Sequence, residues 1–377
     1  MYEFLRERSS HRQLEATLTE CLHVCHGYTF FYNPPIPGLQ RLFHQEWFGV
    51  GPLHPDPEQM AALRAEYFIK VWDDHWETEE DKADFRADNC EWNARWARHL
   101  RELYDAMTIQ SPMMIWVTRC WHDQLYLWWM LTTLDSWGDI DWENVWLVDA
   151  ISHIIGECGS VGDRDVCLPC HSDKALEESF AENRYPIDKE FVTSAKRMWD
   201  AFARGALDEV DQLRRIEEIV QPVASVVEYG LGFMLPRQDK SGQYRLSSLD
   251  QFFLKDFSKN EWLRPIDTAK DWLKKDDVAP LYLDNTFNGS PYLYRLREWD
   301  TYQPDHPLIE SKPIPEGPSG YVNIEYRLTD FGDDIIRNGF TDARLVPPYP
   351  FGGTTIYDPE ALWCTVPEGD GYRVVQV

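Results

Sequence analysis

The chain has 377 residues, 43% of them hydrophobic and 14% aromatic, which is enough for buried cores in roughly two or three domains. Its 64 acidic and 37 basic side chains give a formal net charge of −27. This charge disfavours nucleic acid and anionic membranes as partners, since no basic run offsets it locally. Neither an apolar signal core nor a stretch of about 18 apolar residues occurs, so the sequence predicts a cytoplasmic protein without a membrane partner.

The first part of the chain alternates helices with short apolar strands. Helices are expected up to residue 19 and within residues 57–105. The expected strands are residues 22–25, 40–48, 115–119 and 145–149. Strands separated by helices predict a small, mostly parallel, Rossmann-like sheet, and we assign it to an α/β domain of residues 1–157.

The rest of the chain is predicted to be mainly helical. Residues 158–236 read as a linker followed by a helical domain. In residues 245–377, a serine-capped helix starts near residue 247, a second helix lies near 291–299, and a strand, a turn and a helix start follow within 320–339. Helices followed by a small hairpin suggest a winged-helix-like C-terminal module.

Several short motifs follow one another along the chain. They are residues 22–27 (LHVCHG), 48–53 (FGVGPL), 116–127 (WVTRCWHDQLYL), 197–202 (RMWDAF), 246–250 (LSSLD), 326–332 (YRLTDFG) and 351–353 (FGG). Their order resembles a bacterial family known only as domain of unknown function 1835, with its helical C-terminal partner domain. That family carries an acidic residue and Ser where this sequence has Tyr28 and Thr29, so no role is expected for that carboxylate. The family has no agreed activity, and the resemblance implies architecture alone.

Polar residues stand between the third expected strand and the next helix. Such residues face the ligand crevice of a strand–helix–strand unit. His122 and Asp123 can transfer protons and Arg119 can bind an anion, so these are the candidate catalytic residues, while Gln124 is a candidate ligand-binding residue. The alternative is that Asp123 caps the helix and Gln124 faces inward to satisfy neighbouring strands.

The ends of the other strands add ligand-binding candidates, namely Cys25, His26, Glu46 and Asp149. Because the carboxyl ends of parallel strands meet at one edge, we expect five residues to converge on one concavity, namely Arg119, His122, Asp123, His26 and Glu46. The sequence therefore predicts that the α/β domain binds or transforms a small polar ligand. It identifies no cofactor and leaves open whether the protein is an enzyme.

A group of possible metal ligands lies downstream. It comprises Cys158, Cys167, Cys170 and His171. These side chains suit a tetrahedral zinc site, but the second ligand pair expected of such sites is missing. We predict no structural zinc, with a site at these four residues as the alternative.

Two further functions depend on aromatic and basic residues. Trp92 and Trp96, two of 17 tryptophans, are spaced to face a core together, although an aromatic surface for a protein partner is the alternative. In the winged-helix-like module, Arg295 and Arg297 stand beside Glu298, which is too little positive charge for a DNA-reading helix. We predict no binding to duplex DNA and rank a DNA-binding regulator third.

Overall fold

The computed structural model describes residues 2–26, 40–44, 48–49, 51–71, 78–106, 111–118, 121–149, 173–217, 219–220, 224–265, 290–314 and 324–377. Within them the chain is a mixed α/β protein, and its largest sheet has the order β2-β1-β4-β5-β6. The strands are β1 (Leu22–His26), β2 (Gln40–His44), β4 (Met113–Val117), β5 (Val145–Asp149) and β6 (Arg184–Pro186). The first four are parallel, and β6 pairs antiparallel with β5. The prediction of a mostly parallel sheet is confirmed.

Both faces of this sheet are covered, which explains why its strands read as continuous apolar runs. Helix α4 (Trp121–Ser136) packs on the face that carries Val24 and Ile115. Helix α5 (Asp173–Glu182) covers the other face, where its Phe180 joins Trp116 in a second core.

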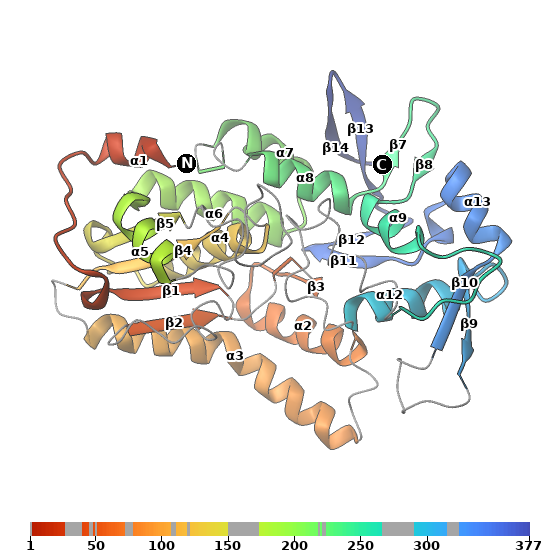
Figure 1. Cartoon of the computed structure of the whole chain (residues 1–377), viewed down its shortest axis with the longest axis horizontal. Coiled ribbons are helices and arrows are strands. Elements are labelled where there is room, and N and C mark those ends of the chain that lie inside the picture. Colours follow the sequence, from red (N-terminus) through yellow and green to blue (C-terminus); the bar gives the residue numbers. More distant parts are fainter. Residues whose placement is uncertain are drawn as a thin grey trace.

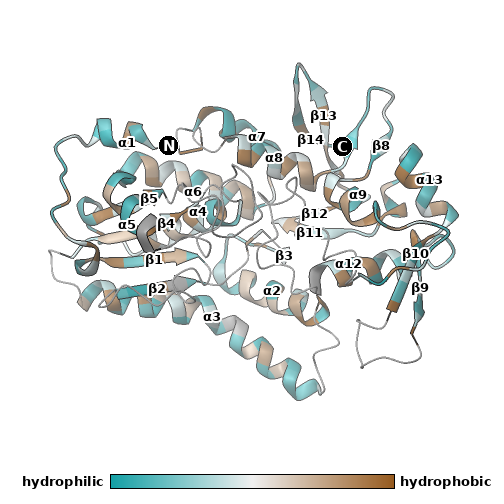
Figure 2. Ribbon diagram, in the orientation of Figure 1, coloured by the Kyte–Doolittle hydropathy of each residue, from teal (hydrophilic) through white to brown (hydrophobic). Residues whose placement is uncertain are grey.

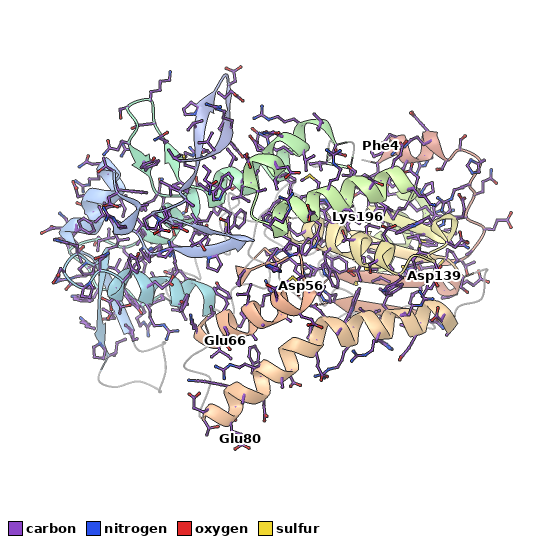
Figure 3. The ribbon with its side chains drawn as sticks, turned by 180° about the vertical axis from the view of Figure 1, so that it is seen from behind. Phe4, Asp56, Glu66, Glu80, Asp139 and Lys196 are labelled. Carbon is purple, nitrogen blue, oxygen red and sulfur yellow. The ribbon has the colours of Figure 1, made fainter. Side chains whose placement is uncertain are left out.

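Outer helices complete the N-terminal half. Helix α6 (Lys189–Ala203) packs on α4, and α2 (Pro57–Val71) packs on α3 (Glu79–Ala106). Figure 2 shows that α3 is mostly hydrophilic. In Figure 3, Glu80 marks one end of α3 and Asp139 lies towards the other, where Asp139 accepts a 2.6 Å hydrogen bond from Arg101.

The helix expected up to residue 19 is much shorter. Helix α1 spans Glu3–Arg8, and only a short 3-10 turn, Leu18–Glu20, follows before β1. Between them Arg12 donates hydrogen bonds to the carbonyl oxygens of Ile187 and Trp142, at 2.9 Å and 3.0 Å. These bonds hold the segment against the ends of β5 and β6, so tertiary contacts override the local helical pattern.

The two tryptophans expected to face a core together are placed differently. Trp96 is buried, with its ring centroid 5.2 Å from that of Trp129 on α4. Trp92 lies about one turn nearer the start of α3 and is 41% exposed. The prediction is right for Trp96 and wrong for Trp92, because the buried positions in this part of α3 are Asn93, Trp96 and Leu100, and Trp92 lies to one side of them.

The C-terminal half, from Leu207 onwards, is also mixed and not mainly helical as predicted. Its helices are α7 (Leu207–Ile216), α8 (Ala224–Met234), α9 (Ser248–Leu254), α12 (Ser290–Thr301) and α13 (Asp330–Asn338). Its strands are β7 (Arg237–Gln238), β8 (Tyr244–Arg245), β9 (Ile309–Pro313), β10 (Ile324–Leu328), β11 (Tyr349–Gly352), β12 (Thr354–Ile356), β13 (Trp363–Glu368) and β14 (Gly371–Gln376). As expected, a serine caps α9: the Ser247 hydroxyl accepts a hydrogen bond from the backbone N–H of Asp250. The winged-helix-like arrangement stays a prediction.

A small sheet joins the two halves. Strand β3 (Gly51–Pro52) pairs in parallel with β11, and Phe351 of β11 packs on Trp121 at the start of α4. In Figure 1 the arrowhead of β1 points towards these C-terminal elements. The carboxyl edge of the parallel sheet therefore faces the C-terminal half.

None of the helices in the described ranges is long and apolar enough to cross a membrane.

Candidate functional site

The chain reverses its direction of winding at the carboxyl end of β1. Strand β2 lies on one side of β1, and β4, the next strand of this sheet along the chain, lies on the other. Open α/β sheets bind ligands at such a switch point. Three polar residues stand there: His26 ends β1, Thr118 follows β4, and Asp123 lies in the first turn of α4.

Asp123 connects the other two residues. Its Oδ1 accepts a hydrogen bond from His26 Nδ1 at 3.2 Å. Its Oδ2 accepts from the backbone N–H of Thr118 at 2.8 Å and from the Thr118 hydroxyl at 2.7 Å. The residue is only 4% exposed, and burial alone would raise its pKa, but the bonds from His26 and Thr118 outweigh burial and lower the pKa below its ordinary value. Asp123 is therefore a charged carboxylate at neutral pH.

This charge assigns the tautomer of His26. A carboxylate only accepts hydrogen bonds, so the proton of a neutral His26 ring lies on Nδ1 and the lone pair on Nε2. An imidazole oriented by a buried carboxylate in this way can take up a proton at Nε2, and the carboxylate then stabilises the imidazolium. The pair is suited to general base catalysis or to accepting a hydrogen bond.

Gln124 follows Asp123 in α4 and is fully buried. Its Nε2 donates to the carbonyl oxygen of Thr118 at 2.7 Å, and its Oε1 accepts from the hydroxyl of Tyr2 at 3.2 Å. Gln124 thus faces inward, as the structural alternative expected. Asp123 accepts from Thr118, which follows β4, so its carboxylate connects the end of β4 to the first turn of α4.

His122 packs against His26. The two rings are nearly parallel, with centroids 6.3 Å apart. Both ring nitrogens of His122 lie below the surface. Burial, together with the positive potential of His26 and Arg64, lowers the pKa of His122 to about 3 and outweighs the opposite effect of Asp123. His122 is therefore a neutral imidazole at physiological pH.

Sequence reasoning missed His44. It is the register partner of His26 on β2, and its Nε2 donates to Asn93 Oδ1 at 2.7 Å. Its ring stacks on Trp129 with centroids 4.6 Å apart, and burial lowers its pKa to about 3. The signal was its place at the end of a strand, but we expected that strand to continue to residue 48.

The remaining candidates are Cys25, Asp149, Arg119 and Glu46, and the structure describes only the first two. Cys25 points to the opposite face of the sheet from His26, where it is buried beside Trp116 and burial raises its pKa. Asp149 is fully buried at the end of β5, one strand beyond β4, and its N–H donates to the carbonyl oxygen of Asn183. The structure therefore brings His26, His122, Asp123 and Gln124 together, and Cys25 is not part of the group. Arg119 and Glu46 lie outside the described residues.

The possible zinc ligands Cys158, Cys167, Cys170 and His171 also lie outside the described residues. In the part of the chain that the structure does describe, no group of three or more His, Cys, Asp or Glu is placed to hold a metal ion.

A scan of the chain against protein-family models finds no match. A search of curated proteins and a search of solved structures also find no match. The resemblance to domain of unknown function 1835 stays a prediction.

Proposed function

We propose that the protein binds a small polar ligand at the carboxyl edge of its parallel sheet, between β1 and β4, and that His26 accepts a proton or a hydrogen bond from it. The observation that carries the proposal is the Asp123 carboxylate, which is held on one oxygen by Thr118 and turns the other to His26. The place of this pair, at the switch point of the sheet, supports it independently.

The chemistry of the pair supports a ligand that carries a hydroxyl, an amide or another acidic N–H or O–H group. A buried carboxylate is costly unless its charge is balanced, and here hydrogen bonds from Thr118 and His26 balance it before any ligand arrives. Such preorganisation favours proton transfer, because the charges need not reorganise during the reaction. No cofactor is part of this proposal.

A ligand screen tests it. Saturation-transfer NMR with nucleosides, sugars, amino acids and their phosphate esters should yield compounds with Kd below about 1 mM. Their signals should be lost with His26→Phe and kept with His99→Phe, because His99 has a side chain 56% exposed on α3. Compounds that bind both variants equally, or a panel that yields no ligand, would argue against the proposal.

Contact between copies of the chain is the second candidate. Trp92 on α3 and Leu63 on α2 are 41% and 46% exposed, and these two helices pack against each other. Tryptophan is enriched among the residues that contribute most to protein interfaces, so the exposed Trp92 favours a protein partner. Sedimentation would support a self-contact if the wild type is an oligomer and Trp92→Glu is a monomer. If both proteins are monomers, a self-contact is excluded.

For the winged-helix-like module we propose a packing role and no contact with DNA. The side chain of Arg295, one of two basic candidates on α12, is only 6% exposed, and its Nε donates to Asp250 at 3.1 Å. An arginine engaged in this way cannot neutralise a phosphate. Fluorescence anisotropy with duplex DNA at physiological salt should show no binding, and salt-sensitive submicromolar binding would contradict the proposal.

A further inference from the structure

We infer that Tyr2 and Gln124 are positioning residues for His26: acting through Thr118, they fix the carboxylate that decides which ring nitrogen of His26 carries the proton. The inference concerns the site of the proposed function and deepens it. It rests on a run of hydrogen bonds from Tyr2 to His26, and its test requires no ligand.

Two side chains of α4 hold Thr118 by hydrogen bonds. Its backbone N–H and hydroxyl both donate to Asp123, while its carbonyl oxygen accepts from Gln124. The N–H and the carbonyl belong to different peptide planes, so consecutive side chains of α4 fix both planes of one residue. A shift of either plane would move the donors that hold the Asp123 carboxylate.

The donor and acceptor groups present fix the direction of each hydrogen bond. The carbonyl oxygen of Thr118 can only accept, so Gln124 must turn its NH₂ group to it and its Oε1 to Tyr2. Tyr2 must then donate. The order of donors and acceptors is therefore determined from Tyr2 to the Nδ1 of His26, although Tyr2 and Gln124 are 122 positions apart in the sequence.

Burial makes the loss of any of these hydrogen bonds costly in free energy. Tyr2, Thr118 and Gln124 are all 0% exposed, so water cannot replace a lost partner. Without the Tyr2 hydroxyl, Gln124 Oε1 is left buried without a donor, and the amide keeps only one of the two hydrogen bonds that fix its orientation against Thr118. Thr118 then holds the Asp123 carboxylate less firmly, and the preference of His26 for a proton on Nδ1 becomes weaker.

The ¹⁵N chemical shifts of the His26 ring test the inference in ligand-free protein, at a pH where the ring is neutral. Wild-type His26, assigned with His26→Gln, should show the Nδ1–H tautomer. Tyr2→Phe and Gln124→Met should each change the ratio of the two tautomers about tenfold towards Nε2–H, the expected effect of one lost buried hydrogen bond. Thr118→Val should do the same, whereas Thr118→Ser, which keeps the hydroxyl, should restore the wild-type ratio.

Tyr126→Phe is the matched control. Tyr126 is a second buried tyrosine, its ring centroid is 5.4 Å from that of His26, and its hydroxyl donates to Met130 Sδ at 3.7 Å, outside the run. It should leave the tautomer ratio unchanged. A wild-type ratio in folded Tyr2→Phe, which keeps the aromatic ring, would overturn the inference, and so would an equal change in Tyr126→Phe. Failure of the ligand screen leaves this result untouched, so the two proposals fail separately.

Discussion

Gly49 lies directly against the imidazole of His122: a Cβ on Gly49 would stand 2.5 Å from His122 Cε1 and 2.6 Å from Nδ1. A third ring atom, Trp121 Cδ1, would be 3.2 Å away. These two rings are themselves packed against other aromatic rings, so they cannot move aside as the end of a flexible side chain can. The backbone between β2 and β3 therefore depends on a glycine to approach the start of α4.

Gly49→Ala should consequently lower the free energy of unfolding by about 1 to 3 kcal/mol, the usual effect of overpacking. Urea unfolding followed by tryptophan fluorescence measures it. Gly371→Ala is the control, because a Cβ there would meet nothing closer than 3.5 Å. A loss for Gly49→Ala no larger than that for Gly371→Ala would contradict the contact.

Buried neutral histidines should make the fold sensitive to acid. His23 is fully buried, its Nε2 donates to the Leu18 carbonyl and its Nδ1 accepts from Trp116 Nε1. Burial lowers its pKa from 6.5 to about 4. Since the unfolded chain takes up this proton first, the stability contribution is complete above pH 6.5 and is lost as the pH falls towards about 4.

His23→Gln should therefore reduce the slope of unfolding free energy against pH, between about pH 6 and about pH 5, by about 1.4 kcal/mol per pH unit. The measurement is urea unfolding at several pH values. His99→Gln, at an exposed position, should keep the wild-type slope. Equal slopes in all three proteins would show that His23 takes up its proton without unfolding.

The parts of the fold that sequence could predict are those where local pattern and tertiary structure agree. Strands β4 and β5 read as apolar runs because both of their faces are buried. The polar residues after β4 were recognised as site candidates, namely His122, Asp123 and Gln124, since residues that follow a parallel strand lie at the carboxyl edge of the sheet.

What sequence could not predict depends on register and on distant contacts. His44 is beside His26 because the register of β1 and β2 pairs the two residues, and a weak strand pattern does not reveal that register. The bond from Tyr2 to Gln124 connects segments with no shared local signal. Arg12 ends the N-terminal helical pattern by binding carbonyl oxygens that only the folded sheet brings together.

A buried ion pair in the C-terminal half carries another prediction. Arg295 Nε donates to Asp250 Oδ1 at 3.1 Å, and the Tyr357 hydroxyl donates to Asp250 Oδ2 at 2.6 Å. Asp250→Asn removes the negative charge beside a buried guanidinium and should lower the unfolding free energy by about 3 to 5 kcal/mol. Arg344→Met, which breaks an exposed pair with Asp342, should remain close to the wild type in the same urea titration. Similar midpoints for the two variants would contradict this role of Asp250.

The pairing of β3 with β11 predicts that the two halves unfold together. The backbone N–H of Leu53 donates to the Gly352 carbonyl at 2.7 Å, and Phe351 packs on Trp121 and Phe202. Fluorescence and circular dichroism should report one shared urea transition. Phe351→Ala should lower its midpoint, with a loss of about 3 to 5 kcal/mol. Two separate wild-type transitions would show that the halves are independent.

Ligand binding beside His26 can be measured by a histidine-ring NMR titration with a compound from the screen. We predict that the ring resonances of His26 and His122 shift together along one binding curve, because the two rings stack. The resonances of His11, His99 and His306, all exposed, should stay in place. A titration that moves exposed histidines and leaves His26 and His122 unchanged would contradict the account.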